Sequence, residues 1–189
     1  LCDQLAITMI DFGLNDDLQQ ASSSGKRPPF TRDQIGSLYL FITKYLARDA
    51  IELNPDLMKR MLTLFFQGGT NTALRTEYET AVLKLLQSQV ELGQSFPELL
   101  RRAQHSGFFR VQELLYRQRG EYDRVLECYV QDETVTELRM FELIEGVMAA
   151  GPSMRQQRIS AQQRAAFREA MIRAMPYLLR RFRDRTVAV

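Results

Sequence analysis

The stretch that decides the fold is AQHSGFFRVQELLYRQRGEYDRVLECYVQD, residues 103–132. Gly107 and Gly120 divide it into short runs whose apolar residues recur every three or four positions, the period of one helix face. A glycine after each run can adopt the left-handed conformation that closes a helix. We therefore expect short helices that reverse at these glycines and pack as antiparallel hairpins, with Leu115 of one helix against Leu126 of the next.

The same helical period continues outside this stretch. It is carried by apolar residues at 35–46, 74–85 and 135–148. Thr31 followed by Gln34 has the spacing of a capping box, and Asn54 before Pro55 is typical of a helix start. Sustained alternation of apolar and polar residues is missing, so we expect no strands. The pattern predicts about eight or nine helices of roughly 10–18 residues joined mostly by short connections.

Together these features predict an all-α chain, an irregular α-solenoid of antiparallel helix hairpins. Irregular is the right term because the hairpins do not recur at a strict period of about 34 or 40 residues, as the consensus helical repeats do. With 189 residues, 45% of them apolar, the sequence fits a single solenoid segment over residues 1–189. A polar, Ser- and Pro-containing loop is expected at about residues 15–30. The longest apolar run, Leu38–Ile42, is far shorter than the roughly 20 residues of a membrane-spanning helix.

The motifs that usually carry catalysis or cofactor binding do not occur. A phosphate-binding glycine loop, an H-E-x-x-H pair, a C-x-x-C pair and a nucleophile elbow are all missing. The single histidine, His105, is expected in the last turn of a helix, where it favours the helix dipole; a role as general base is the alternative. Cys128 is expected to be a small buried apolar residue. Two cysteines 126 positions apart fit a reducing compartment. We therefore expect that the chain has no enzymatic activity and binds no cofactor and no metal.

Charge is concentrated at the end of the chain. Residues 153–189 contain nine arginines and only two acidic residues, Glu169 and Asp184. Two helices broken near Pro176 are expected to carry this Arg-rich part, with Phe167 and Leu178 among the residues that supply an inward face. The arginines form a candidate interaction surface: Arg155, Arg158, Arg164, Arg168, Arg173, Arg180, Arg181, Arg183 and Arg185.

This surface has three interpretations, which differ in the partner that the arginines meet. A solvated outer face or a contact with an acidic protein comes first, because arginine stems also cover apolar surface. An anionic membrane comes second. Nucleic acid comes a distant third, and it is not expected as a partner.

Residues 103–132 also resemble a known family. The order is a helix with a central Leu115-Tyr116, a glycine, then Tyr122-x-x-Val-Leu-x-Cys-Tyr129 and an acidic stop at Asp132. This tract resembles the α-solenoid of the vacuolar protein sorting tethering subunits of the CORVET and HOPS complexes. Clathrin heavy-chain repeats are also built from such helix pairs.

The resemblance implies a non-enzymatic role. Such subunits join a β-propeller to a long α-solenoid, carry a RING domain near the C-terminus, tether early endosomes before fusion and engage an endosomal Rab GTPase. Since the sequence opens at Leu1 and shows no signal peptide, we expect a solenoid segment of a longer protein. Its expected function is a scaffold in vesicle tethering and protein transport, on the cytosolic face of endosomal membranes, with other tethering subunits as partners. The alternative is a peripheral membrane- or Rab-binding module that uses the Arg-rich surface.

Overall fold

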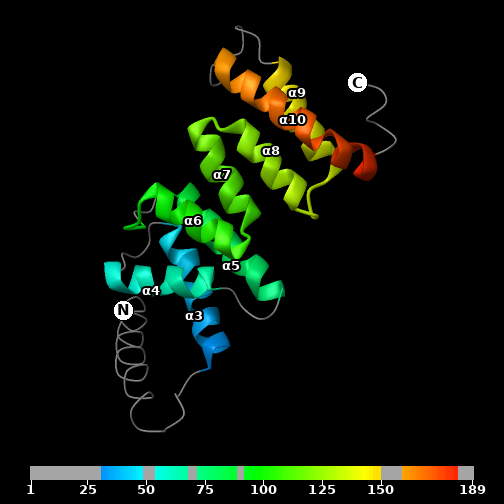
Figure 1. Cartoon of the computed structure of the whole chain (residues 1–189). Helices are drawn as coiled ribbons and strands as arrows, with labels where there is room; N and C mark the ends of the chain where they lie inside the picture. The colour runs from blue at the N-terminus through cyan, green and yellow to red at the C-terminus, as the bar shows by residue number, and fades with distance from the viewer. Residues whose placement is uncertain (1–30, 49–53, 68–71, 89–91, 150–158, 183–189) are drawn as a thin grey trace. The chain divides into compact units, whose positions relative to one another are not determined.

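The computed structural model describes residues 31–48, 54–67, 72–88, 92–149 and 159–182. Every regular element within these ranges is an α-helix, and none of them contains a strand, so the predicted all-α class is confirmed. The helices, labelled as in Figure 1, are α3 (Arg32–Leu46), α4 (Pro55–Phe66), α5 (Thr72–Gln87), α6 (Phe96–Ser106), α7 (Phe109–Arg119), α8 (Tyr122–Gln131), α9 (Glu137–Ala149) and α10 (Ala161–Arg181). The loop expected at about 15–30 lies outside the described residues.

Local side-chain chemistry explains where several helices begin. Thr31 and Gln34 form the expected capping box, in which the Thr31 hydroxyl accepts from the Gln34 N–H and the Gln34 amide oxygen accepts from the Thr31 N–H. Asn54 accepts from the N–H of Asp56, and Pro55 occupies the first turn of α4. None of the described helices is long and apolar enough to span a membrane.

The chain divides into two compact units between Gln94 and Ser95. In the first unit, α3, α4 and α5 all contact one another around aromatic rings. The Phe65 ring lies 5.0 Å from that of Tyr78 and 6.4 Å from that of Tyr39, measured between centroids. A Cβ atom on Gly36 would clash with the Tyr78 hydroxyl oxygen. A glycine in α3 therefore lets the aromatic side chain of α5 approach its backbone.

The second unit is built around one buried apolar cluster. Helices α6 to α8 pack in series, and α10 packs on both α8 and α9 (Figure 1). Leu126 of α8, Met140 of α9 and Phe167 of α10 are fully buried in this cluster. Burying each such side chain contributes roughly 1.5–3 kcal/mol. The cluster thus joins the decisive stretch to the helices that follow it.

The turns of the decisive stretch form as predicted. Gly107 closes α6 with φ of 63°, and Gly120 closes α7 with φ of 70°. The Gly120 carbonyl also accepts a hydrogen bond from the side chain of Gln163 at 3.0 Å. A Cβ atom on Gly120 would lie 2.5 Å from that same amide nitrogen. Gly120 is therefore required both by its left-handed backbone and by the close approach of α10.

The expected break at Pro176 is wrong. Helix α10 runs without interruption through Pro176 for 21 residues. The missing proline N–H leaves the carbonyl of Ile172 without its helical partner, but Ile172 lies on the solvent side, where water can bond that carbonyl. Ala170 before the proline and Leu178 after it are both buried in the common cluster. Packing on both sides of Pro176 therefore outweighs the loss of one backbone hydrogen bond.

Candidate functional site

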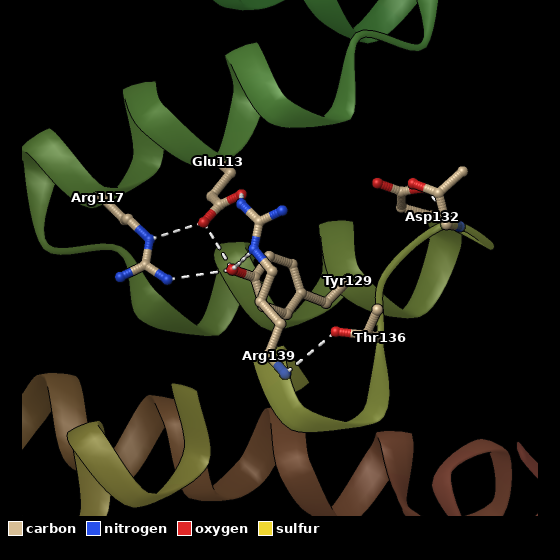
Figure 2. Close-up of polar contacts among 7 residues, drawn as sticks. Glu113, Arg117, Tyr129, Asp132, Thr136 and Arg139 are labelled. Carbon is tan, nitrogen blue, oxygen red and sulfur yellow. Dashed lines mark hydrogen bonds and ion pairs between the residues drawn. The ribbon is translucent and has the colours of Figure 1, made fainter. Parts of the chain in front are cut away.

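A buried charge network joins α7, α8 and α9. The Glu113 carboxylate of α7 is buried and accepts from the Tyr129 hydroxyl at 2.6 Å and from Arg117 Nε at 3.0 Å. Its other oxygen accepts from Arg139 Nη2 of α9. Both arginines also donate to the Tyr129 oxygen, each at 3.1 Å. Figure 2 shows the four side chains converging from three helices.

The electrostatics of this network favour a fixed protonation state. Burial and the hydrogen bond donated to Glu113 raise the pKa of Tyr129, so its hydroxyl stays protonated. Burial lowers the pKa of Arg139, but Glu113 and Tyr129 outweigh it, so the pKa is raised on balance. The same holds for Arg117. The pKa values of Tyr129 and of both arginines therefore move away from neutrality, so the network fits a structural clamp better than acid–base chemistry.

A second polar cluster fixes the joint between α8 and α9. The Asp132 carboxylate accepts from the Thr134 N–H at 2.9 Å and from its hydroxyl at 2.7 Å, which turns the chain after α8. Arg181 of α10 donates to the carbonyls of Asp132 and Val135 at 3.2 and 2.9 Å, and also to that of Glu133. One guanidinium thus satisfies three loop carbonyls. Asp132, the acidic residue that ends the sequence motif, therefore lies in a turn that Arg181 of α10 stabilises.

The arginines of the predicted surface differ in their contacts. Arg155, Arg158, Arg183 and Arg185 lie outside the described residues. Arg164, Arg168, Arg173, Arg180 and Arg181 all lie on α10. Arg181 is occupied by the loop carbonyls, and Arg173 contacts Glu127 of α8 at 3.5 Å. Arg168 and Arg180 are exposed and form no ion pair with the described residues. Among the arginines that the structure describes, Arg181 is therefore engaged within its own unit, whereas Arg168 and Arg180 stay exposed.

The remaining predicted residues lie where expected. His105 is exposed in the last turn of α6. Cys128 is buried, and burial, followed by the nearby carboxylate of Glu113, raises the pKa of its thiol to about 12. Its Sγ lies 3.7 Å from the amide oxygen of the buried Gln112. Within the described ranges, no three His, Cys, Asp or Glu residues lie together as a metal site would require.

Sequence reasoning missed the network around Glu113. One signal was available, because Glu113 and Arg117 are four residues apart on a helix, the spacing of an ion pair. That spacing predicts an exposed pair, whereas Glu113 is buried. The other partners, Tyr129 and Arg139, are 16 and 26 residues away, and their approach depends on how three helices pack.

Comparison with known proteins finds sequence similarity to one kind of protein. The chain is similar to vacuolar protein sorting-associated protein 8 homologs. It is 25% identical over 138 residues to that of Homo sapiens, and equally so to that of Mus musculus. In each case the matched region covers 72% of this chain and 10% of the relative. The chain therefore spans about a tenth of the length of the relatives it matches.

Two further comparisons gave no match. No protein-family model and no solved structure matches the chain. The relationship therefore depends on the similarity to the two homologs, whose name agrees with the resemblance of residues 103–132 to vacuolar protein sorting subunits.

Proposed function

We propose that the chain is a non-enzymatic scaffold segment of a vesicle-tethering subunit related to vacuolar protein sorting-associated protein 8. The observation that carries this proposal is the similarity over 138 residues to the human and mouse homologs. The segment would support protein–protein assembly of a CORVET-type complex during endosome fusion and vesicle-mediated transport. Its partners would be other tethering subunits and an endosomal Rab GTPase, on the cytosolic face of the endosomal membrane.

The proposed mechanism is geometric. Stacked helix hairpins over residues 1–189 would form one irregular solenoid segment that holds binding modules at fixed spacing. Packing inside the second unit supports stacking. There α6 contacts α7, α7 contacts α8, and α8 contacts α9. Helices that each pack on the next one along the chain are the arrangement expected of stacked hairpins.

The test uses the full-length protein of the source organism, tagged at its own locus. Affinity purification should recover the other tethering subunits from the intact protein. Deleting residues 95–189, the second compact unit, should reduce that recovery. Replacing the same residues by the matching segment of the human homolog provides the control, and it should restore recovery. The proposal fails if no tethering subunit accompanies the intact protein, or if the deletion is expressed normally and keeps every partner.

A second candidate function is a peripheral membrane- or Rab-binding module. The exposure of Arg168 and Arg180 on α10 favours it, because such guanidiniums attract anionic headgroups or an acidic protein surface. Sedimentation with phosphatidylserine vesicles at low and physiological salt tests the membrane version. Binding that is salt-sensitive and is lost in Arg168→Glu/Arg180→Glu would support it. Equal sedimentation of this variant and the unmodified chain would contradict it.

A further inference from the structure

The exposed apolar residues of the second unit are concentrated on its last two described helices. On α10, Ile172 is 69% exposed and Leu179 is 43% exposed. On α9, Leu138 is 60% exposed and Met148 is 38% exposed. Helices α6, α7 and α8 have no large apolar side chain of this kind. The α9–α10 layer is therefore the part of this unit that leaves apolar surface uncovered.

The outward face of α10 is apolar in the middle and basic at both edges. Helical spacing places Ala161, Ala165, Ile172 and Leu179 along one line, opposite the buried Phe167. The exposed Arg168 lies on one side of this line. On its other side lie Arg180, Arg173 and the acidic residue of the described helix, Glu169. A helix with an apolar stripe between guanidiniums suits a partner helix that carries carboxylates.

The outward face of α9 is acidic, opposite in charge to that of α10. Leu138, Glu142, Glu145 and Ala149 are exposed and recur every three or four residues, opposite the buried Met140 and its neighbours on the inner face. The basic residue of α9, Arg139, is held by Glu113 in the buried network. The face therefore presents one large aliphatic side chain and two carboxylates.

We infer that the α9–α10 layer is a self-association surface, on which α9 of one copy packs against α10 of a second copy. Both helices bury their inner faces in the same cluster, so the acidic and the basic face both point away from it. A two-fold arrangement brings each acidic face onto a basic face, so every apolar and ionic contact is made twice. This inference goes beyond the tethering role and does not depend on it.

Two features of the layer favour a second copy over an anionic bilayer. The apolar line of α10 begins with two alanines, Ala161 and Ala165, which let another helix approach closely but offer little to insert into lipid. The exposed carboxylates of Glu142 and Glu145 belong to the same layer and would be repelled by anionic headgroups. Against a second copy, those same carboxylates gain guanidinium partners.

The test is charge reversal with recovery on mixing. Sedimentation velocity of the 189-residue chain over a range of concentrations should show a reversible monomer–dimer equilibrium. Arg168→Glu/Arg180→Glu makes both outward faces acidic, and Glu142→Arg/Glu145→Arg makes both basic. Each variant alone should have a dimer dissociation constant raised at least about tenfold. An equimolar mixture of the two should form a heterodimer, because each acidic face then meets a basic one.

Matched controls separate this surface from general charge effects. Lys59→Glu/Lys84→Glu changes the net charge by the same amount on exposed residues of the other unit, and it should leave the dimer unchanged. Ile172→Ser should weaken the dimer without altering charge, while circular dichroism confirms that helix content is kept. The inference is overturned if the unmodified chain stays monomeric at every concentration or the mixture stays monomeric. It is equally overturned if the lysine control weakens the dimer as much, or if only anionic vesicles bind this layer.

Discussion

Replacing Glu113 by glutamine tests whether the buried charge network stabilises the second unit. The buried carboxylate accepts from one hydroxyl and two guanidiniums, so a neutral amide leaves two half-exposed cations without their counter-charge. The amide NH2 group also points a donor at an arginine that is itself a donor. Removing one member of a buried pair costs about 3–5 kcal/mol.

Partial solvent exposure reduces that figure. The side chains of Arg117 and Arg139 are 42% and 41% exposed, so water and salt screen part of the lost interaction. We therefore expect Glu113→Gln to lower the free energy of unfolding by about 2–3 kcal/mol. At roughly 2–4 °C per kcal/mol for a chain of this size, the melting temperature should fall by about 4–12 °C.

Glu98 provides a matched control for this substitution. Its carboxylate also bonds two arginines, Arg101 and Arg102, but on the surface of α6. Glu98→Gln removes the same charge and a similar number of hydrogen bonds, but the Glu98 side chain is 33% exposed whereas that of Glu113 is 10% exposed, so water can replace the lost bonds and the effect on urea unfolding should be small. Equal shifts in the urea midpoint for Glu98→Gln and Glu113→Gln would refute the claim that burial makes the Glu113 network important.

Three further predictions use single groups whose surroundings the structure defines. Gly120→Ala should lower stability by at least about 1–2 kcal/mol in thermal unfolding, and by more than Gly93→Ala, because both glycines have positive φ but only Gly120 has a neighbour within contact distance. In a Cys2→Ser background, Cys128 should react with iodoacetamide only after urea unfolding. Because the pKa of its thiol is raised to about 12 from the ordinary 9.0, the free energy of unfolding should also fall as the pH rises from about 9 to 12. Rapid labelling of the native protein would contradict this. The pKa of Glu98, lowered to about 2 by its two arginine hydrogen bonds, should rise toward 4.5 in 1 M salt when followed by NMR, and a salt-independent value would contradict the surface ion pairs.

Local features were the part of the fold that the sequence predicted well. The capping box at Thr31, the Asn54-Pro55 start and the left-handed Gly107 and Gly120 all involve groups within a few residues of one another. Backbone sterics and short-range hydrogen bonds decide such features, so the residue types are sufficient to predict them. The capping box of Ser160 and Gln163 is equally local, and it was overlooked.

Features that depend on packing between helices could not be predicted in the same way. Proline at position 176 signals a break, yet burial of Ala170 and Leu178 on either side keeps α10 continuous. An arginine-rich run suggests one surface, yet Arg181 bonds the carbonyls of a loop nearly 50 residues earlier. In both cases the deciding contacts join residues far apart in sequence, which local propensity does not include.

The buried network and the proposed self-association surface are physically linked through α9. Arg139 is held by Glu113, and the Val135 carbonyl, just before α9, is held by Arg181 of α10. These two contacts fix the rotation of α9 about its axis near its first turn, and that rotation decides where Glu142 and Glu145 point. Loosening the network should therefore weaken pairing between copies even though Glu113 itself is buried. If Glu113→Gln lowered stability but left the dimer dissociation constant unchanged at temperatures where the chain stays folded, the network would not be what orients the acidic face.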